Sequence, residues 1–320
     1  MAKLTAVIPT HNRAKLLKRL IDSLLNQTLS QDKYNIIVVD DCSTDNTQKM
    51  MKNLTKKNKI ISYYRLNKPS GAGFTRNKGI EQIKEGYIVF IDDDCIAYKN
   101  TLEEIESFLK EYPFVKCFKG DPDSLKEVGL IDRYLNDCLT IKYTNYKKIK
   151  PDLYEVYNIP TCLGVYKRDV FDLKFNNKKI RFKNLKKYED AEINHILNKK
   201  RIKFYYSPKI RCIHDMKNEG LIKMYHRKRK AGTAEFVIKV MHPDYPLRIP
   251  NNFKNIILFI LNTFYKPVSI IKNTKLKYII PFMFLSFFHQ ATYNYWIYKS
   301  KKMFDKKIKS LDEIDMMNAQ

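Results

Sequence analysis

The stretch Phe90-Ile91-Asp92-Asp93-Asp94-Cys95 places three carboxylates directly after an apolar segment. Residues 87–91 are apolar without alternation, which is typical of a parallel strand buried on both faces. Adjacent carboxylates at the end of such a strand repel one another and lose hydration, so we expect a cation to neutralise them. A hard divalent metal that holds a phosphate fits this chemistry, with a solvated acidic turn as the alternative.

Strand and helix patterns alternate over residues 1–100. Apolar runs of strand length occur at Leu4–Ile8, Asn35–Val39, Ile60–Tyr64 and Tyr87–Ile91. Helical spacing relates the apolar residues Leu16, Leu17, Leu20, Ile21, Leu24 and Leu25. We expect Ser43 to cap the next helix, and Asn100 with Glu103 to form a capping box. The alternation predicts an α/β fold with a mostly parallel sheet flanked by helices, whose ligands lie beyond the carboxyl ends of the strands.

Polar clusters follow three of these predicted strands. The first strand ends at Pro9-Thr10-His11-Asn12-Arg13, the second at Asp40-Asp41-Cys42-Ser43 and the fourth at the acidic triplet. Singly, they could be a turn, a helix cap and a solvated loop. Because the carboxyl ends of parallel strands share one edge of a sheet, we expect the three clusters to form one site.

Glycines gather in one further segment. Of the nine glycines in the chain, Gly71, Gly73 and Gly79 fall within residues 67–79, beside Arg76 and Asn77. Glycine lets a backbone approach a ligand closely, and arginine pairs well with phosphate. The segment is therefore a candidate phosphate-binding loop, or a glycine-rich loop that merely starts a helix.

Four motifs in succession resemble the signatures of family-2 glycosyltransferases. They are AVIPTHNR at 6–13, IVVDDCSTD at 37–45, GFTRNKG at 73–79 and FIDDD at 90–94. The resemblance implies the GT-A fold, a Rossmann-like α/β architecture, and inverting transfer of a sugar from a nucleotide donor.

The resemblance also implies a role for individual motif residues. Asp41 would accept a hydrogen bond from the nucleotide base, Arg76 would lie near the phosphates, and Asp92 would lie near the ribose. Asp94, the last acidic residue of the triplet, would ligate Mn²⁺ or Mg²⁺. The other residues implied in the nucleotide-sugar pocket are Pro9, Thr10, Asn12, Arg13, Asn77 and Asp93.

The second half of the chain is similar to the same family over shorter stretches. Residues 161–171 and the run Tyr188-Glu189-Asp190-Ala191-Glu192 are similar to its acceptor-side segment and Glu-Asp pair. The resemblance implies that Asp190 is the base that removes the acceptor hydroxyl's proton. Interaction of these acids with a helix dipole is the alternative. His214 would complete the metal or phosphate site, or would serve as a structural histidine.

The net charge limits the classes of partner that we expect, and the cysteine content limits the expected cellular environment. The formal net charge of +26 and the pI near 9.6 imply a negative partner, either a phosphorylated substrate, a nucleic acid or a membrane surface. Nucleic acid is disfavoured, because the basic residues form no recognisable binding module and the acidic triplet would repel phosphate. The six cysteines include no Cys-x-x-Cys pair, so neither a zinc knuckle nor a disulfide framework is predicted, and a reducing cytoplasm is expected.

The composition changes after about residue 240. Ile256–Phe264 and Tyr278–Phe288 are strongly apolar, and aromatic residues mixed with lysines follow them. Tyr278–Tyr298 is long enough to cross a bilayer, but basic residues flank it on both sides and polar residues interrupt it. Interfacial or re-entrant helices on an anionic membrane are therefore favoured over a span, a core segment or an oligomer interface.

These patterns predict a GT-A domain at residues 1–235, with a nucleotide-binding half at 1–100 and an acceptor half at 101–235. A helical, membrane-associating tail is predicted at 236–320. We expect transfer of one sugar from a nucleotide-diphosphate sugar to a hydroxyl of a glycan or lipid-linked glycan precursor, at the cytoplasmic face of the cell membrane. A polyprenyl-phosphate sugar synthase is the alternative. A sugar nucleotidyltransferase is more distant, since the first strand lacks a glycine-rich loop with a lysine.

Overall fold

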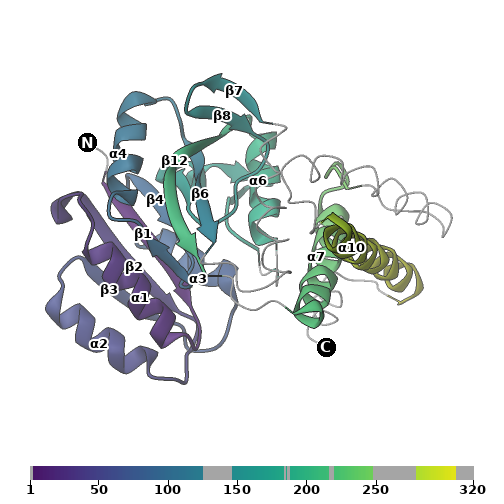
Figure 1. Ribbon diagram of the computed structural model, residues 1–320, viewed down its shortest axis with the longest axis horizontal. Coiled ribbons are helices and arrows are strands. Elements are labelled where there is room, and N and C mark those ends of the chain that lie inside the picture. The colour runs from purple at the N-terminus through teal and green to yellow at the C-terminus, as the bar shows by residue number, and fades with distance from the viewer. Residues whose placement is uncertain are drawn as a thin grey trace. The chain divides into compact units, whose positions relative to one another are not determined.

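The computed structural model describes residues 3–124, 146–183, 185, 188–215, 220–247 and 279–307 (Figure 1). The chain divides into two compact units. The first unit comprises residues 1–125, 146–184 and 189–215, and the second comprises 126–145, 185–188 and 216–320. All of the predicted site residues belong to the first unit.

A large sheet forms the centre of the first unit. Its strands lie in the order β3-β2-β1-β4-β9-β6-β12-β8-β7, with β5 paired to β12 beside this path. The strands are β1 (Leu4–Thr10), β2 (Tyr34–Asp40), β3 (Ile61–Arg65), β4 (Tyr87–Phe90), β5 (Cys95–Ala97), β6 (Cys117–Ser124), β7 (Lys147–Lys150), β8 (Leu153–Val156), β9 (Gly164–Lys167) and β12 (Phe204–His214). A separate ribbon pairs β10 (Lys174–Phe175) with β11 (Lys178–Lys179).

Helices alternate with these strands as the sequence predicted. They are α1 (Ala14–Leu25), α2 (Thr47–Lys57), α3 (Ala72–Glu81), α4 (Thr101–Glu111) and α6 (Glu189–Lys199), with short 3₁₀ turns η1 (Gln31–Lys33) and η3 (Arg168–Asp172). Strand β1 is covered on both faces: Leu4, Ala6 and Ile8 join a core with the buried leucines of α1, whereas Val7 meets α3. The absence of alternation in the apolar runs therefore reflects burial from two sides.

The strand directions confirm the α/β class and refine it. Strands β2, β1 and β4 run parallel, and β3 continues this parallel half beside β2. Beyond β4 the sheet is mixed, because β9 lies antiparallel to both β4 and β6, whereas β12 runs parallel to β6. The parallel half aligns the carboxyl ends of β1, β2 and β4, which brings the three polar clusters to one edge.

The two predicted caps are wrong in detail. Helix α2 begins at Thr47, where the Asp45 carboxylate accepts a hydrogen bond from the Thr47 amide at 3.0 Å. Ser43 does not cap it, because the Ser43 hydroxyl accepts from the Asn12 amide at 2.8 Å. Helix α4 does follow Asn100, but Glu103 accepts from the Thr28 hydroxyl, so no capping box forms.

The clustered glycines serve packing within the first unit. A Cβ atom added at Gly73 would lie 2.4 Å from the Lys183 carbonyl oxygen, and one added at Gly79 would lie 2.5 Å from Val7. Gly71 precedes α3 with a φ of 87°, a conformation that favours glycine. The interpretation as a loop that starts a helix is therefore sufficient to explain all three glycines.

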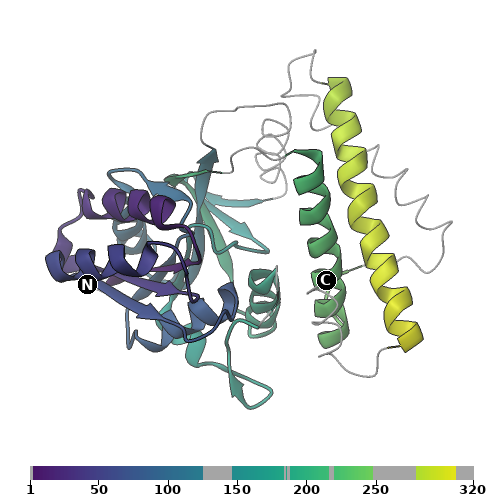
Figure 2. The same ribbon diagram turned by 90° about the horizontal axis from the view of Figure 1, so that it is seen from below.

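In the second unit, helices α7 (Leu221–Met241) and α10 (Ile279–Lys307) pack side by side (Figure 2). Gly232 allows close approach, since an added Cβ would lie 2.6 Å from the Tyr293 carbonyl oxygen. The predicted domain boundary at residue 235 falls inside α7. Ile256–Phe264 lies outside the described residues. Within the described part of the chain, the helices lack the combined length and apolarity needed to cross a membrane, so the span considered above is not found there.

Candidate active site

The acidic triplet after β4 meets the polar cluster after β1. The Thr10 hydroxyl donates to the Asp93 carboxylate at 2.8 Å. The Arg13 guanidinium lies 2.9 Å from Asp93 and 3.0 Å from Asp94. Two of the three predicted clusters therefore form one site, as expected from parallel strands that end at the same edge. Pro9 lies within β1, paired with Val39 of β2.

Asp94 lies beside His214, its predicted companion. The Nε2 atom of His214 is 3.2 Å from Oδ1 of Asp94. The segments that carry Asp94 and His214 are also joined through the backbone, since the Asp215 amide donates to the Asp94 carbonyl at 3.0 Å. The Asp215 carboxylate in turn pairs with Arg19 at 2.7 Å. Strand register places His214 directly opposite Cys95, the residue after Asp94.

Oxygen and imidazole ligands at this point fit a hard divalent cation. The buried Oδ1 atom of Asp94 accepts no hydrogen bond of good geometry from the described residues. Apart from its 3.2 Å contact with His214, this buried carboxylate oxygen has no partner among the described residues, and a cation would satisfy it. Asp94 and His214 would hold Mn²⁺ or Mg²⁺, which favour oxygen donors.

The second cluster supports the loops around the site. Both oxygens of Asp41 accept backbone amides of the segment before α3, from Ser70 at 2.6 Å and from Gly71 at 2.8 Å. The Asn12 side chain, in a residue with φ of 54°, accepts from the Thr44 amide at 2.7 Å. Asp41 and Asn12 therefore tie three strand-end loops together, and their predicted contacts with a nucleotide stay predictions.

The guanidinium of Arg76 is buried and pairs with two carboxylates. It is 4% exposed, and its guanidinium donates to Asp92 at 2.9 Å and to Glu189 at the start of α6. The neighbouring Asn77 pairs with both backbone groups of Phe182, at 2.8 and 2.9 Å. The side chains of Arg76 and Asn77 thus join α3 to the second half of the domain, and their predicted roles beside a nucleotide are not decided by these contacts.

Asp190 lies at the start of α6, half-buried and next to the bridge that Arg76 forms. Its carboxylate accepts the Ala191 amide at 2.8 Å. Burial and the neighbouring Glu189 carboxylate raise the pKa of Asp190 to about 6, although the positive charge of Arg76 opposes them. A carboxylate with this pKa gains proton affinity while staying ionised near neutral pH, as a general base requires.

The carboxylates of the triplet titrate differently because their surroundings differ. Burial raises the pKa of Asp92 to about 6 and also raises the pKa of Asp93, despite Arg76 and Arg13 respectively. Burial acts in the same direction on Asp94, but the contacts with His214 and Arg13 outweigh it and lower the pKa of that carboxyl. For His214, burial is outweighed by Cys162 and Asp94, which raise its pKa to about 11. Asp94 is thus the member of the triplet most firmly ionised.

Two ion pairs of the site, Arg19 with Asp215 and Arg76 with Glu189, were not predicted from the sequence. Arg19 lies on the polar face of α1 and Asp215 follows β12, and nothing in the local pattern of either indicates that they meet. Glu189 belongs to the recognised Glu-Asp pair, but its partner Arg76 is 113 residues away in sequence. Each pairing joins elements that only the folded chain brings together.

A known protein family matches the sequence of this chain. Residues 5–173, just over half of the chain, match the family described as Glycosyl transferase family 2. The chain belongs to this family of transferases. Its membership confirms the resemblance drawn from the four motifs, and three of these motifs supply residues to the site above.

Curated relatives are similar to this chain over part of its length. Poly(ribitol-phosphate) beta-N-acetylglucosaminyltransferase TarP of Staphylococcus aureus is 36% identical over 113 residues, which cover 35% of this chain and 34% of TarP. GalNAc(5)-diNAcBac-PP-undecaprenol beta-1,3-glucosyltransferase of Campylobacter jejuni is 37% identical over 95 residues, or 29% of this chain and 30% of that protein. The matched stretch spans about a third of each relative's length.

Solved structures of glycosyltransferases share the fold. Mannosyltransferase PcManGT from Pyrobaculum calidifontis, in complex with GDP-Man and Mn²⁺, aligns with a TM-score of 0.64 and 15% identity, covering 96% of this chain and 88% of PcManGT. TarS 1–349 of S. aureus aligns with a TM-score of 0.56 and 16% identity, covering 94% and 91%. The predicted GT-A architecture is confirmed, and at these identities the likeness extends to the fold alone.

Proposed function

We propose that the protein transfers a sugar, with inversion and with a divalent metal, from a nucleotide-diphosphate sugar to a hydroxyl of a glycan or lipid-linked glycan precursor. Family membership supports the reaction class. The names of the relatives support a glycan acceptor, since TarP acts on poly(ribitol phosphate) and the C. jejuni enzyme acts on an undecaprenol-linked glycan. UDP-GlcNAc is the first donor to test, because it is the donor bound in a TarS structure.

One arrangement carries the proposal: an ionised Asp94 beside His214, and a separate carboxylate, Asp190, which follows the Glu189 that Arg76 joins to the triplet. Inverting transfer requires one group that stabilises the leaving diphosphate and another that activates the acceptor from the opposite side of the sugar carbon. The bridge from Asp92 through Arg76 to Glu189 fixes the second group relative to the first.

The metal would be held at Asp94 and His214, where Mn²⁺ or Mg²⁺ supplies positive charge for the departing diphosphate. Arg13 adds a further cation on the same edge, 3.0 Å from Asp94 and half-exposed, and would contact phosphate oxygens. Thr10 and Asp93 orient Arg13, because Asp93 binds both of them.

Asp190 would take the proton from the acceptor hydroxyl. Its raised pKa of about 6 leaves most of the carboxylate ionised at neutral pH. Burial around the carboxylate limits its hydration and preserves its basicity. The acceptor hydroxyl would attack the sugar carbon as the bond to the diphosphate breaks, and the proton would move to Asp190.

We also propose that the second unit associates peripherally with an anionic membrane, at its cytoplasmic face, because it exposes apolar side chains. In helix α7, Ile222 is 74% exposed, and in helix α10 Phe284 is 61% exposed. Exposed apolar side chains can enter the interface between headgroups and acyl chains, where lysines and arginines add attraction to anionic lipids.

The test is a donor panel with purified protein and Mn²⁺, read as released nucleotide. We expect release with UDP-GlcNAc or another nucleotide-diphosphate sugar when a glycan acceptor is present, and loss of release in EDTA. Polyprenyl phosphate as the sole productive acceptor would favour the polyprenyl-phosphate sugar synthase instead. Failure with every donor and acceptor, or full activity in EDTA, would contradict the proposal.

A further inference from the structure

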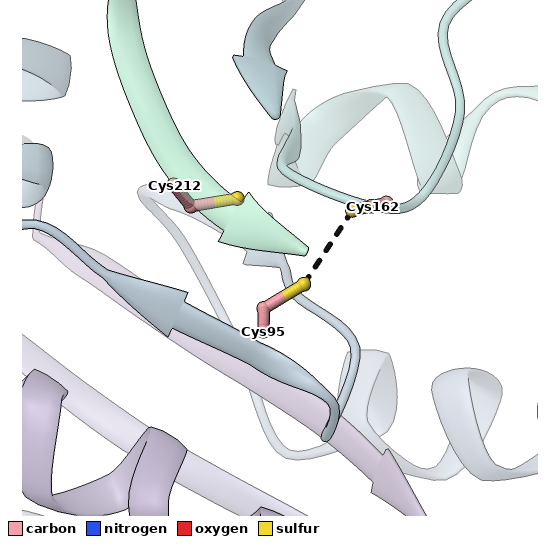
Figure 3. A group of neighbouring side chains, drawn as sticks. All are labelled: Cys95, Cys162 and Cys212. Carbon is pink, nitrogen blue, oxygen red and sulfur yellow. Dashed lines mark hydrogen bonds between the residues drawn. The ribbon is translucent and has the colours of Figure 1, made fainter. Parts of the chain in front are cut away.

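Three buried cysteines lie close together next to the acidic triplet. Cys95 opens β5, Cys162 precedes β9 and Cys212 lies near the end of β12 (Figure 3). The Sγ atoms of Cys95 and Cys162 are 3.5 Å apart, and all three sulfurs lie within 4.8 Å of one another. Each cysteine is at most 8% exposed. We call these residues the thiol cluster.

Strand register places an imidazole beside the thiol cluster. Strands β5 and β12 are antiparallel, with His214 opposite Cys95 and Cys212 opposite Ala97. Because side chains alternate along a strand, Cys212 and His214 project to the same face. A ring nitrogen of His214 lies within 4.8 Å of the sulfur of Cys162, and likewise of the sulfur of Cys95. Four potential ligands thus come from three separate segments.

The cluster differs from the other buried thiol of the first unit. A buried cysteine ordinarily packs as a small apolar side chain, as Cys117 does in β6. In the thiol cluster, every pair of sulfurs lies within 4.8 Å. Four-coordinate zinc binds thiolates at about 2.3 Å, which corresponds to about 3.8 Å between sulfurs around a tetrahedral ion. The Cys95–Cys162 separation of 3.5 Å is close to that value, and the other two pairs of sulfurs lie within 4.8 Å.

We propose that Cys95, Cys162, Cys212 and His214 form a Zn²⁺ site. Three thiolates and an imidazole are a known ligand set for structural zinc, whereas Mg²⁺ and Mn²⁺ favour oxygen. The ion would tie β5, the segment before β9 and β12 together. Since Cys95 follows Asp94 in sequence, the site would also fix the backbone of the predicted metal carboxylate.

Zinc occupancy would also affect the carboxylate side. His214 lies 3.2 Å from Asp94 and within 4.8 Å of the Cys162 sulfur, so the same ring lies beside both the oxygen and the sulfur ligands. When the ring ligates zinc, its contact with Asp94 weakens and it no longer serves as a ligand to Mn²⁺ or Mg²⁺, which Asp94 would then hold without it. The oxygen ligands and the sulfur ligands would therefore bind different metals, and binding at one site would affect the other through the His214 ring.

The first experiment titrates reduced, metal-free protein with Zn²⁺ against a chromophoric chelator, and with Cd²⁺ while following thiolate-to-metal absorption in the ultraviolet. We expect one ion per chain, a Kd below about 1 μM, and absorption equivalent to three thiolates. Zinc should remain bound in a tenfold excess of Mn²⁺. Absence of stoichiometric binding, fewer than three thiolates, or displacement by Mn²⁺ would overturn the assignment.

Variants identify the ligands. Cys162→Ser and Cys212→Ser should each weaken Zn²⁺ binding at least about 100-fold, and His214→Gln about tenfold. Cys117→Ser, which also alters a buried thiol, is the matched control and should bind as the wild type does. Equal weakening by the control, or unchanged binding in His214→Gln, would refute the four-ligand site.

A measurement on the unaltered chain covers the case in which a cysteine variant fails to fold. Co²⁺ in place of Zn²⁺ should give the visible spectrum of a tetrahedral ion with sulfur ligands, and a six-coordinate spectrum would contradict the proposal. None of these readouts depends on sugar transfer. A negative transfer assay would not contradict the zinc site, and a negative metal-binding result would not contradict the transfer reaction.

Discussion

The two compact units use positive charge in different ways. In the first unit, the arginines of the site pair with carboxylates, as Arg76 does with Asp92 and Glu189. In the second unit, Arg229 and Lys299 lie over the Trp296 ring, at 5.4 and 4.4 Å from its centroid. Buried ion pairs fix geometry, because removing one partner leaves an uncompensated charge. Cations on aromatic rings keep charge and apolar surface together, which suits a binding face.

Because the paired charges of the site lie in the first unit, we expect turnover to depend on them, and most of all on Asp94. Asp94→Asn should lower turnover about 1,000-fold, because it removes the charge that would hold the metal, and each tenfold loss corresponds to about 1.4 kcal/mol. Nucleotide release with Mn²⁺ measures this. Asp152→Asn alters an outer carboxylate paired with Lys209 and should leave turnover unchanged. Wild-type turnover in Asp94→Asn would show that the metal is held elsewhere.

Asp190→Asn should lower transfer about 100-fold while the donor KM changes little, since only proton abstraction is lost. In the wild type, kcat should rise as the pH increases through about 6, because burial raises the pKa of Asp190 to about 6 and the base acts when deprotonated. The variant should lack this rise. A collapse of donor binding in the variant would instead place Asp190 in the nucleotide site.

Arg76→Lys should lower kcat about tenfold and the free energy of unfolding by about 2 kcal/mol. Lysine keeps the charge but cannot reach Asp92 and Glu189 in the forked geometry of arginine, so one charged hydrogen bond is lost. Kinetics and chemical denaturation measure the two effects. Arg211→Lys, at an exposed pair with Asp123, is the control and should change neither. If both variants behave alike, the buried bridge has no special role.

The smallest expected effect concerns the second unit. Ile222→Ser with Phe284→Ser should weaken binding to anionic vesicles about fivefold, since partly buried apolar side chains contribute about 1 kcal/mol together. Co-sedimentation with vesicles, at low and high salt, measures it. Phe114→Ser removes a similarly exposed ring, 58% accessible, from the first unit and should have no effect. Equal loss from Phe114→Ser would place the binding face on the first unit.

Much of the first unit could be predicted because its pattern is local. The four strands of the parallel half lie where the apolar runs indicate, and α6 begins at Glu189 with Ile193, Ile196 and Leu197 buried. The helix start at Thr47 could not be predicted in the same way. The N-cap position falls on Asn46, and the first amide of the helix is bound by Asp45, whereas the Ser43 hydroxyl accepts from Asn12 of another loop.

The sequence by itself determined the alternation of strands and helices, the acidic strand end and the family, because periodicity and short motifs lie within a few residues of one another. Tertiary structure alone decided that Arg76 bridges to Glu189 and that Cys95, Cys162 and Cys212 meet. The spacing of the cysteines predicted no metal site, since ligands brought together by strand pairing leave no regular interval in sequence. Their proximity follows from the pairing of β5 with β12 and from the segment before β9, contacts between residues 67 or more positions apart.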